Sequence, residues 1–277
     1  MKRAKDNDSD KDSRQAEHIE ERSTPRTPVI YDVVRRYGEE EMARPAVSLW
    51  WSGLAAGLSM SFSLLAEAIL RMHIAEYDWQ RLIVSLGYPV GFVMVVLGRQ
   101  QLFTENTLTV VLPLLHRRDA KAAASVARLW AVVLAGNLVG ALAIAWVVAH
   151  TGVFDEEAKR TFSLVALEGT GAPFGLVLLR GIFAGWLIAL MVWLMPGAEV
   201  ARIWIIILLT YVIALGGFAH VIAGSVDKLF LVWTGHMSVA GYLGGFLLPS
   251  FLGNVIGGVS LVAALNHVAA APGHARN

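Results

Sequence analysis

The chain alternates between long apolar runs and short polar segments, and the apolar runs have the length of membrane spans. A helix needs about 20 apolar residues to cross the hydrocarbon core of a bilayer. Uninterrupted runs of this kind lie at residues 47–70, 131–149, 173–194 and 249–268. Two further runs, 82–115 and 203–225, are each interrupted by a polar segment. The runs lack the short alternating segments of a transmembrane barrel, so the pattern predicts six membrane-spanning helices.

The first interruption, residues 99–107, places an arginine, two glutamines, a glutamate, an asparagine and two threonines inside an apolar run. Irregular backbone at membrane depth must face a cavity or be covered by protein. Polar residues inside a membrane are candidate functional residues by default. We therefore interpret this segment as a candidate site, and the alternative is an ordinary surface loop between two short helices.

The second interruption, residues 217–225, is glycine-rich and contains His220. About thirty residues after each interruption, the following span carries a Gly-Asn motif with a further glycine: Gly136, Asn137 and Gly140 after the first, Gly253, Asn254 and Gly257 after the second. Three spans per half, with the middle span broken, is the pattern of an inverted-topology repeat. The pattern predicts that the two breaks meet near the membrane midplane and enclose a substrate site.

Composition narrows the possible functions. The chain is 56% apolar and 16% charged, with a mean hydropathy of +0.55, which excludes an ordinary soluble domain. A net charge of +1 gives no reason to expect a nucleic-acid partner. The absence of cysteine excludes disulfides and thiolate chemistry. The sequence has no nucleophile–base pair or nucleotide loop, and its histidines lack metal-ligand spacing, so we expect no enzyme, no cofactor and no metal site.

The ends of the chain differ from its apolar centre. Residues 1–27 carry dense mixed charge and are expected to form a disordered tail. Residues 28–46 predict an amphipathic helix that lies on the membrane surface or, equally, packs on the protein's own cytoplasmic face. The spanning domain is expected at 47–270 and a short tail at 271–277. Lysine and arginine gather before the first span and in an expected loop at 116–128, which predicts cytoplasmic termini. We also expect loops at 150–172 and 233–248.

Four motifs in order along the chain resemble the formate/nitrite transporter family over residues 30–270: Leu102-Phe103-Thr104, Gly136-Asn137, Gly217-Phe218-Ala219-His220 and Gly253-Asn254. The resemblance implies an all-α integral membrane protein of the bacterial inner membrane. Its six transmembrane helices would form two inverted three-helix repeats, with broken second and fifth helices, in an aquaporin-like bundle. It also implies a homopentamer with one pore per protomer.

The same resemblance implies a channel or proton-coupled transporter for a small monovalent weak-acid anion such as formate or nitrite. Thr104 and His220 match the family's central threonine and pore histidine. We expect hydrophobic constrictions and the remaining pathway residues at Tyr88, Phe92, Leu102, Phe103, Glu105, Asn106 and Ile213. His220 would pass a hydrogen bond or proton to the anion. The alternative is a neutral histidine that only binds a carbonyl freed by the break.

Several positions depart from the family pattern. Ala219 stands where an acidic residue is common, and Gly185 and Gly224 stand where asparagines are common. These departures leave open a pore for a small neutral solute, or a membrane protein without flux whose N-terminal tail recruits a partner.

Glu105 stands where a small or hydroxyl residue is usual in the family. It is protonated by burial, or paired with Arg99 or His220, or a first-turn residue favoured by the helix dipole, which is our preferred reading. Two other intramembrane charges, Glu67 and Arg180, are expected to pair with each other.

Overall fold

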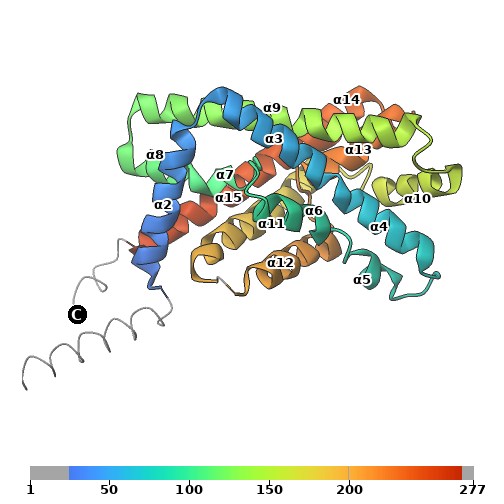
Figure 1. Cartoon of the computed structure of the whole chain (residues 1–277), viewed down its shortest axis with the longest axis horizontal. Helices are drawn as coiled ribbons and strands as arrows, with labels where there is room; N and C mark the ends of the chain where they lie inside the picture. Colours follow the sequence, from blue (N-terminus) through green and yellow to red (C-terminus); the bar gives the residue numbers. More distant parts are fainter. Residues whose placement is uncertain (1–24, 199, 270–277) are drawn as a thin grey trace, which may run out of the picture.

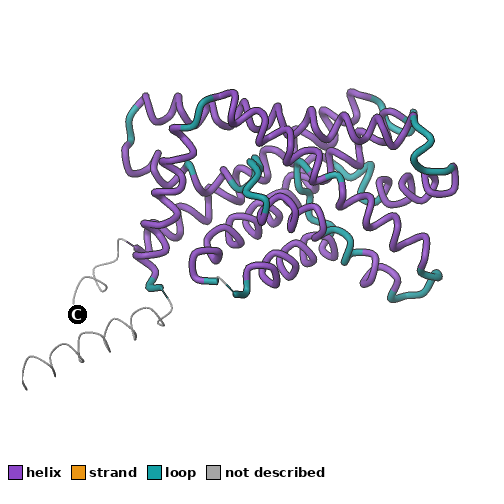
Figure 2. Tube along the Cα trace, in the orientation of Figure 1, coloured by secondary structure: helices purple, strands orange, loops and turns teal. Residues whose placement is uncertain are grey.

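The computed structural model describes residues 25–198 and 200–269, and this part of the chain is a helical bundle without strands (Figures 1 and 2). The predicted tail at 1–27 lies almost entirely, and the tail at 271–277 entirely, outside the described residues. The helices of the first half, in order, are α2 (Thr27–Ala43), α3 (Ala46–Met60), α4 (Phe62–His73), α5 (Gln80–Val84), α6 (Pro89–Leu97), α7 (Asn106–Thr109), α8 (Val111–Arg117) and α9 (Ala120–His150). Those of the second half are α10 (Glu156–Leu167), α11 (Phe174–Leu194), the 3₁₀ turn η1 (Met195–Gly197), α12 (Arg202–Gly216), α13 (Ala223–Trp233), α14 (Val239–Tyr242), the π turn η2 (Leu243–Leu247) and α15 (Leu248–Ala269).

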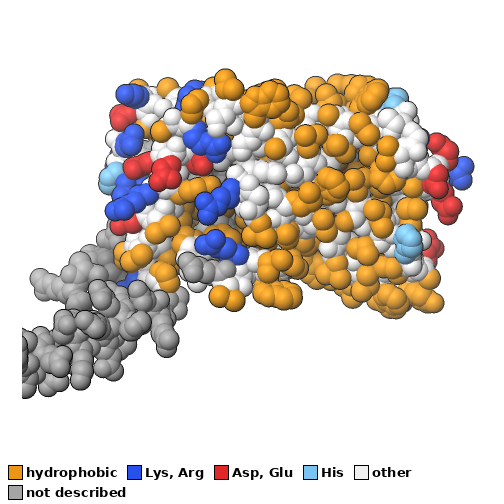
Figure 3. Space-filling model, viewed as in Figure 1, with side chains coloured by type: hydrophobic (Ala, Val, Ile, Leu, Met, Phe, Trp, Pro, Cys, Tyr) orange, Lys and Arg blue, Asp and Glu red, His pale blue; other side chains and the backbone are white. Residues whose placement is uncertain are grey.

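The predicted spans are present. Five stretches of the described chain are long and apolar enough to cross a membrane: Ala46–His73, Gln80–Leu97, Ala120–His150, Phe174–Gly197 and Val239–Leu265. The fifth span in chain order is the shorter α12, because the second break ends this helix at Gly216. Space-filling Figure 3 shows charged side chains gathered at the two ends of the molecule, with apolar side chains between them. This distribution is that of a membrane-embedded bundle.

Glycines allow the long helices to approach closely in pairs, α3 along α9 and α11 along α15. A Cβ atom at Gly57 would overlap the carbonyl group of Asn137, and one at Gly185 would overlap the carbonyl group of Asn254. Small residues at such contacts let helix backbones pack together in a membrane. Close packing therefore explains why a glycine stands at position 185, and an asparagine, which is common in the family at this position, would not fit here.

Three predicted loops are wrong in part, because each contains a helix with a good N-cap. α9 begins at Ala120, inside the expected loop 116–128, and α10 occupies the middle of 150–172. The last span begins at Val239 and not at residue 249, so most of the expected connection 233–248 is helical. The side chains of Asp119, Asp155 and Ser238 accept hydrogen bonds from the first turns of these helices. Such caps stabilise the first turn of a helix. In the Gly-rich stretch 233–248, a helix also pairs backbone groups that would otherwise lack hydrogen bonds at membrane depth, and this gain exceeds the free-energy cost of placing glycine in a helix.

Helix α2 packs on one end of the bundle, against α7 and α8, at the left of Figure 1. Val34 and Met42 are buried in this contact, whereas Val29 and Val33 remain exposed. A Cβ at Gly38 would overlap the carbonyl of Thr109, so the contact is close. The structure thus describes α2 packed on an end face of the bundle, and its contact with the membrane surface stays a prediction.

Candidate functional site

Both interruptions are breaks in helices and lie midway along the bundle, where Figure 2 shows two central loop segments. The first break runs between α6 and α7, and Arg99 within it has a left-handed backbone with φ of 49°. The second break follows α12, which is capped at its C-terminus by Gly217 with φ of 60°. A left-handed residue commonly terminates a helix, and glycine adopts that conformation without strain.

Asn137 of α9 holds the first break through its side-chain amide. Its Oδ1 accepts a hydrogen bond from the backbone N–H of Phe103 at 2.9 Å. Its Nδ2 donates to the carbonyls of Gly53 on α3 and Gln101 in the break, both at 2.8 Å. Because Asn137 is fully buried, these bonds satisfy backbone groups that water cannot reach.

Asn254 of α15 holds the second break in the same way. Its Oδ1 accepts from the N–H of Val221 at 2.8 Å. Its Nδ2 donates to the carbonyls of Gly181 on α11 at 2.9 Å and Ala219 in the break at 2.8 Å. The two Gly-Asn motifs therefore have equivalent roles in the two halves.

Thr104 and His220 join the two breaks. Thr104 Oγ1 lies 2.8 Å from His220 Nε2, and the two residues are 0% and 1% exposed. The backbone N–H of Ala223 donates to His220 Nδ1 at 3.2 Å. Since Nδ1 accepts this bond, the proton of the ring is on Nε2, which donates to Thr104. The imidazole is therefore neutral in this arrangement, and the hydroxyl hydrogen of Thr104 has no acceptor among the described residues.

Aromatic rings surround this pair. The ring of Phe92 packs edge-on against His220, with centroids 5.0 Å apart, and Tyr88 packs against Phe92 at 5.2 Å. Phe103 is fully buried and stacks on Phe251 at 5.3 Å. Of the other predicted pathway residues, Leu102 and Ile213 are also fully buried. The structure thus brings the predicted apolar residues to both breaks.

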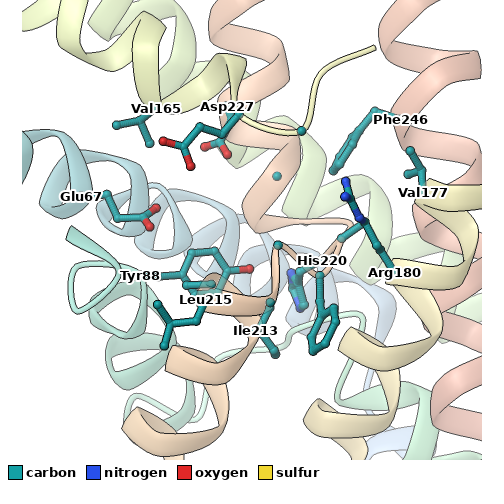
Figure 4. Close-up of a pocket in the computed structure, with 18 of the residues that line it drawn as sticks. Glu67, Tyr88, Val165, Val177, Arg180, Ile213, Leu215, His220, Asp227 and Phe246 are labelled. Carbon is teal, nitrogen blue, oxygen red and sulfur yellow. The ribbon is translucent and has the colours of Figure 1, made fainter. Parts of the chain in front are cut away.

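A cavity of about 580 Å³ opens on one side of His220 and extends to the end of α10 (Figure 4). We call it the α10-side cavity. Its floor includes Tyr88, Ile213 and His220. In Figure 4, Glu67 from α4 and Asp227 from α13 direct their carboxylates into it, and Arg180 from α11 points in from the opposite wall.

The predicted ion pair between Glu67 and Arg180 is wrong. The structure gives this pair no contact within 4.0 Å, because the two side chains lie on opposite walls of the cavity. Instead, Arg71 binds Glu168, with Nη1 and Oε1 2.8 Å apart. Lys228, which is 4% exposed, donates from Nζ to the backbone carbonyls of Ala166 and Glu168 at the end of α10. These bonds neutralise the carbonyl end of that helix.

A second cavity of about 330 Å³ lies at the opposite end, beneath α2. We call it the α2-side cavity, and it is lined by Tyr37, Arg99, Glu105, Thr109 and Arg202 among others. Thr104 is bonded to His220 at the α10-side cavity and is followed by Glu105 at the α2-side cavity. The Thr104–His220 pair therefore lies between the two cavities.

Glu105 is not paired with Arg99 or with His220, so that reading is wrong for the described chain. It occupies the N-cap position of α7, and its side chain does not cap that helix. Its Oε1 is buried and has no hydrogen-bond partner.

Asn106 uses its amide within the first break. Its Nδ2 donates to Gln101 Oε1 at 3.0 Å and to the carbonyl of Leu102 at 3.2 Å, and its Oδ1 accepts from Thr109 at 3.0 Å. These bonds hold the shape of the break, and contact of Asn106 with a substrate stays a prediction.

Asp227 and Lys228 line the α10-side cavity, and neither is among the site residues predicted from the sequence. The available signal was two adjacent charged residues in the apolar segment that restarts after the second break. Arg202 of the α2-side cavity is likewise not among the residues predicted from the sequence.

Comparisons with known proteins agree with this architecture. The model of the family described as "Formate/nitrite transporter" matches residues 28–268. Inner membrane protein YfdC of Escherichia coli is 39% identical over 248 residues, covering 90% of this chain and 80% of that protein. Formate channel BtFdhC of Bacillus thuringiensis is 28% identical over 242 residues, covering 84% and 91%. A solved structure of a pentameric formate channel with formate bound has a TM-score of 0.70 at 21% identity, covering 80% and 96%, which supports the fold.

Proposed function

Because the chain belongs to the formate/nitrite transporter family, we propose that it forms a pore for small monovalent weak-acid anions, with formate and nitrite as the first candidates. The chain is an integral membrane protein, and its family comprises transporters and channels and not enzymes. The relative from B. thuringiensis is a formate channel, which supports formate as the first substrate to test.

The observation that carries this proposal is the 2.8 Å contact between Thr104 Oγ1 and His220 Nε2. In this arrangement Thr104 accepts a hydrogen bond from the imidazole N–H, and its own hydroxyl hydrogen is free to bind another acceptor. An anion that reaches the pair can accept that hydrogen bond. The N-terminus of α13, which begins at Ala223 beside His220, adds a positive dipole end near the same point.

The apolar surroundings favour passage of the anion as its neutral acid. Four apolar side chains are fully buried around the breaks: Phe92, Leu102, Phe103 and Ile213. They cannot form hydrogen bonds or ion pairs that would stabilise a charge. A bare charge at the centre of a bilayer costs at least about 2.5–3.5 kcal/mol. A proton that accompanies the anion through this region removes most of that cost. We therefore expect coupled movement of anion and proton.

We further propose a homopentamer in the inner membrane with α2 on the cytoplasmic side. The solved channel of the same fold is pentameric, and the relative from E. coli is an inner membrane protein. Basic residues near the α2 end, Arg35, Arg36, Arg44 and Arg117, fit the cytoplasmic side under the positive-inside rule.

Flux through proteoliposomes tests the proposal. Vesicles that contain the purified protein and a trapped pH dye are given an inward gradient of formate, nitrite, acetate or lactate at several external pH values. We expect saturable uptake of at least one anion, faster at lower external pH, with acidification of the interior. His220→Ala should abolish this uptake, and His236→Ala, a change at an exposed loop histidine, should not.

The opposite result would favour the other candidate function. Ala219, Gly185 and Gly224 bring no polar side chains to the second half of the path. Passage of a neutral solute such as glycerol, without anion flux in either the wild type or His220→Ala, would overturn the anion pore and support a neutral-solute pore.

A further inference from the structure

Glu105 combines three features that the proposed pore does not yet explain. It directly follows Thr104, it lines the α2-side cavity, and its Oε1 is buried without a hydrogen-bond partner. An ionised carboxylate in such a place is unfavourable unless it is paired and hydrogen-bonded. A neutral carboxylic acid is the form that fits this site.

The charged and titratable groups around Glu105 leave it without a partner. Glu41 on α2 is bound to Arg44 at 2.9 Å. Burial raises the pKa of Tyr37, also on α2, to about 12, so its phenol is neutral at physiological pH.

The two arginines of the cavity do not form an ion pair with Glu105. Arg99 in the first break and Arg202 at the start of α12 line the same cavity, and neither is within 4.0 Å of the carboxylate as an ion pair. Arg202 Nε is itself buried and unpartnered. Helix α15, which packs on α7, contains no Asp, Glu, Lys or Arg.

His220 is poorly suited to supply the proton. Its neutral ring carries a single N–H, which is donated to Thr104, while its other nitrogen accepts from Ala223. Loss of that proton would leave an imidazolate anion in an apolar region. Another group must therefore exchange the proton that accompanies the anion.

We infer that Glu105 is this group, the proton donor and acceptor at the α2-side mouth of the pore. This inference rests on the proposed function, since it requires an anion that passes as its neutral acid. Arg99 and Arg202 attract the anion into the cavity. The O–H bond of Glu105 breaks as an O–H bond to the anion forms, and the neutral acid moves on to Thr104.

The carboxylate that remains shares the cavity with the two arginines, and it recovers a proton from the bulk solution on the α2 side, relayed through water that fills the cavity. Transfer in the other direction reverses each step, so that an acid arriving from Thr104 protonates the Glu105 carboxylate. Glu105 then sets how flux depends on pH at this mouth.

Three variants of the full-length protein test the role. Glu105→Gln keeps the shape of the side chain and removes proton exchange, Glu105→Asp keeps an acid, and Glu40→Gln makes the same chemical change at an exposed carboxylate of α2. Formate flux is measured in proteoliposomes between pH 5.5 and 8, after size-exclusion chromatography shows that each variant retains the wild-type assembly. We expect Glu105→Gln to lower flux at neutral pH by about a hundredfold or more, the scale of general acid–base effects. Glu105→Asp should restore most of the flux, and Glu40→Gln should match the wild type.

Two results would overturn this role while leaving the anion pore intact. Wild-type flux in Glu105→Gln at every pH would show that no proton exchange occurs at this residue. Increased flux in Glu105→Gln would show that the glutamate acts as an electrostatic barrier. Absence of formate and nitrite flux in the wild type would contradict the proposed function itself.

Discussion

Asn137 and Asn254 make the same three hydrogen bonds in the two halves of the molecule, each to one N–H and one carbonyl of a helix break and to a carbonyl of the neighbouring helix. Asn137 thereby fixes the break that contains Thr104, and Asn254 fixes the break that contains His220. The 2.8 Å contact between Thr104 and His220 depends on both asparagines, because it joins the two breaks.

Replacement of Asn254 by alanine should destabilise the protein strongly. It removes three hydrogen bonds and leaves buried backbone groups unpaired, each at a cost of about 1–3 kcal/mol. We expect the melting temperature of the purified protein to fall by several degrees, at roughly 2–4 °C per kcal/mol. Ser260→Ala, at an exposed position of the same helix, is the control. An unchanged melting temperature in Asn254→Ala would show that these bonds do not hold the break.

Gly185 and Gly175 both lie on α11 and should respond oppositely to alanine. A Cβ at Gly185 would overlap the carbonyl of Asn254, whereas a Cβ at Gly175 meets nothing within 4 Å. Gly185→Ala should therefore force α11 and α15 apart and lower the melting temperature. Gly175→Ala should be neutral or stabilising by up to about 1 kcal/mol, because alanine favours helix over glycine. Equal melting of the two variants would contradict the close contact.

The hydroxyl of Thr104 should be required for flux, and its methyl group should not. Thr104→Val keeps the volume of the side chain and removes both the acceptor for His220 and the free hydrogen. Thr104→Ser keeps both. We expect anion flux in proteoliposomes to be lost in the valine variant and largely retained in the serine variant. Retention of flux by Thr104→Val would show that transport does not require the hydrogen bond between Thr104 and His220.

Lys228 should hold the C-terminal end of α10 in place beside the α10-side cavity. Lys228→Met leaves the carbonyls of Ala166 and Glu168 without their donor. Amide hydrogen exchange over residues 166–170 should then increase. Lys159→Met removes a lysine that binds Glu156 on the outer surface of α10, and it should leave this exchange unchanged. Similar exchange in the wild type and in Lys228→Met would contradict the anchoring role.

The sequence by itself determined the number of spans, the position of both breaks and the residues that carry them. These features follow from local physics, because apolar length sets a membrane helix and a polar interruption must be covered or face a cavity. The repeated Gly-Asn motifs also indicated the two-fold organisation, since each recurs at a similar distance after its break. Helix starts were less visible: the caps at Asp119, Asp155 and Ser238 extended helices into stretches that composition suggested as loops.

Only the tertiary structure decided which side chains meet. Glu67 and Arg180 lie at a similar depth by sequence, yet they come from helices on opposite walls of the α10-side cavity, while Arg71 binds Glu168. The sequence likewise left three environments open for Glu105, and the packing of α2 and α12 around it placed its carboxyl in a cavity without a partner. The positions of the spans depend on residues that are neighbours along the chain. The pairing of charges depends on which way each helix face points in the bundle, and contacts between distant segments set that orientation.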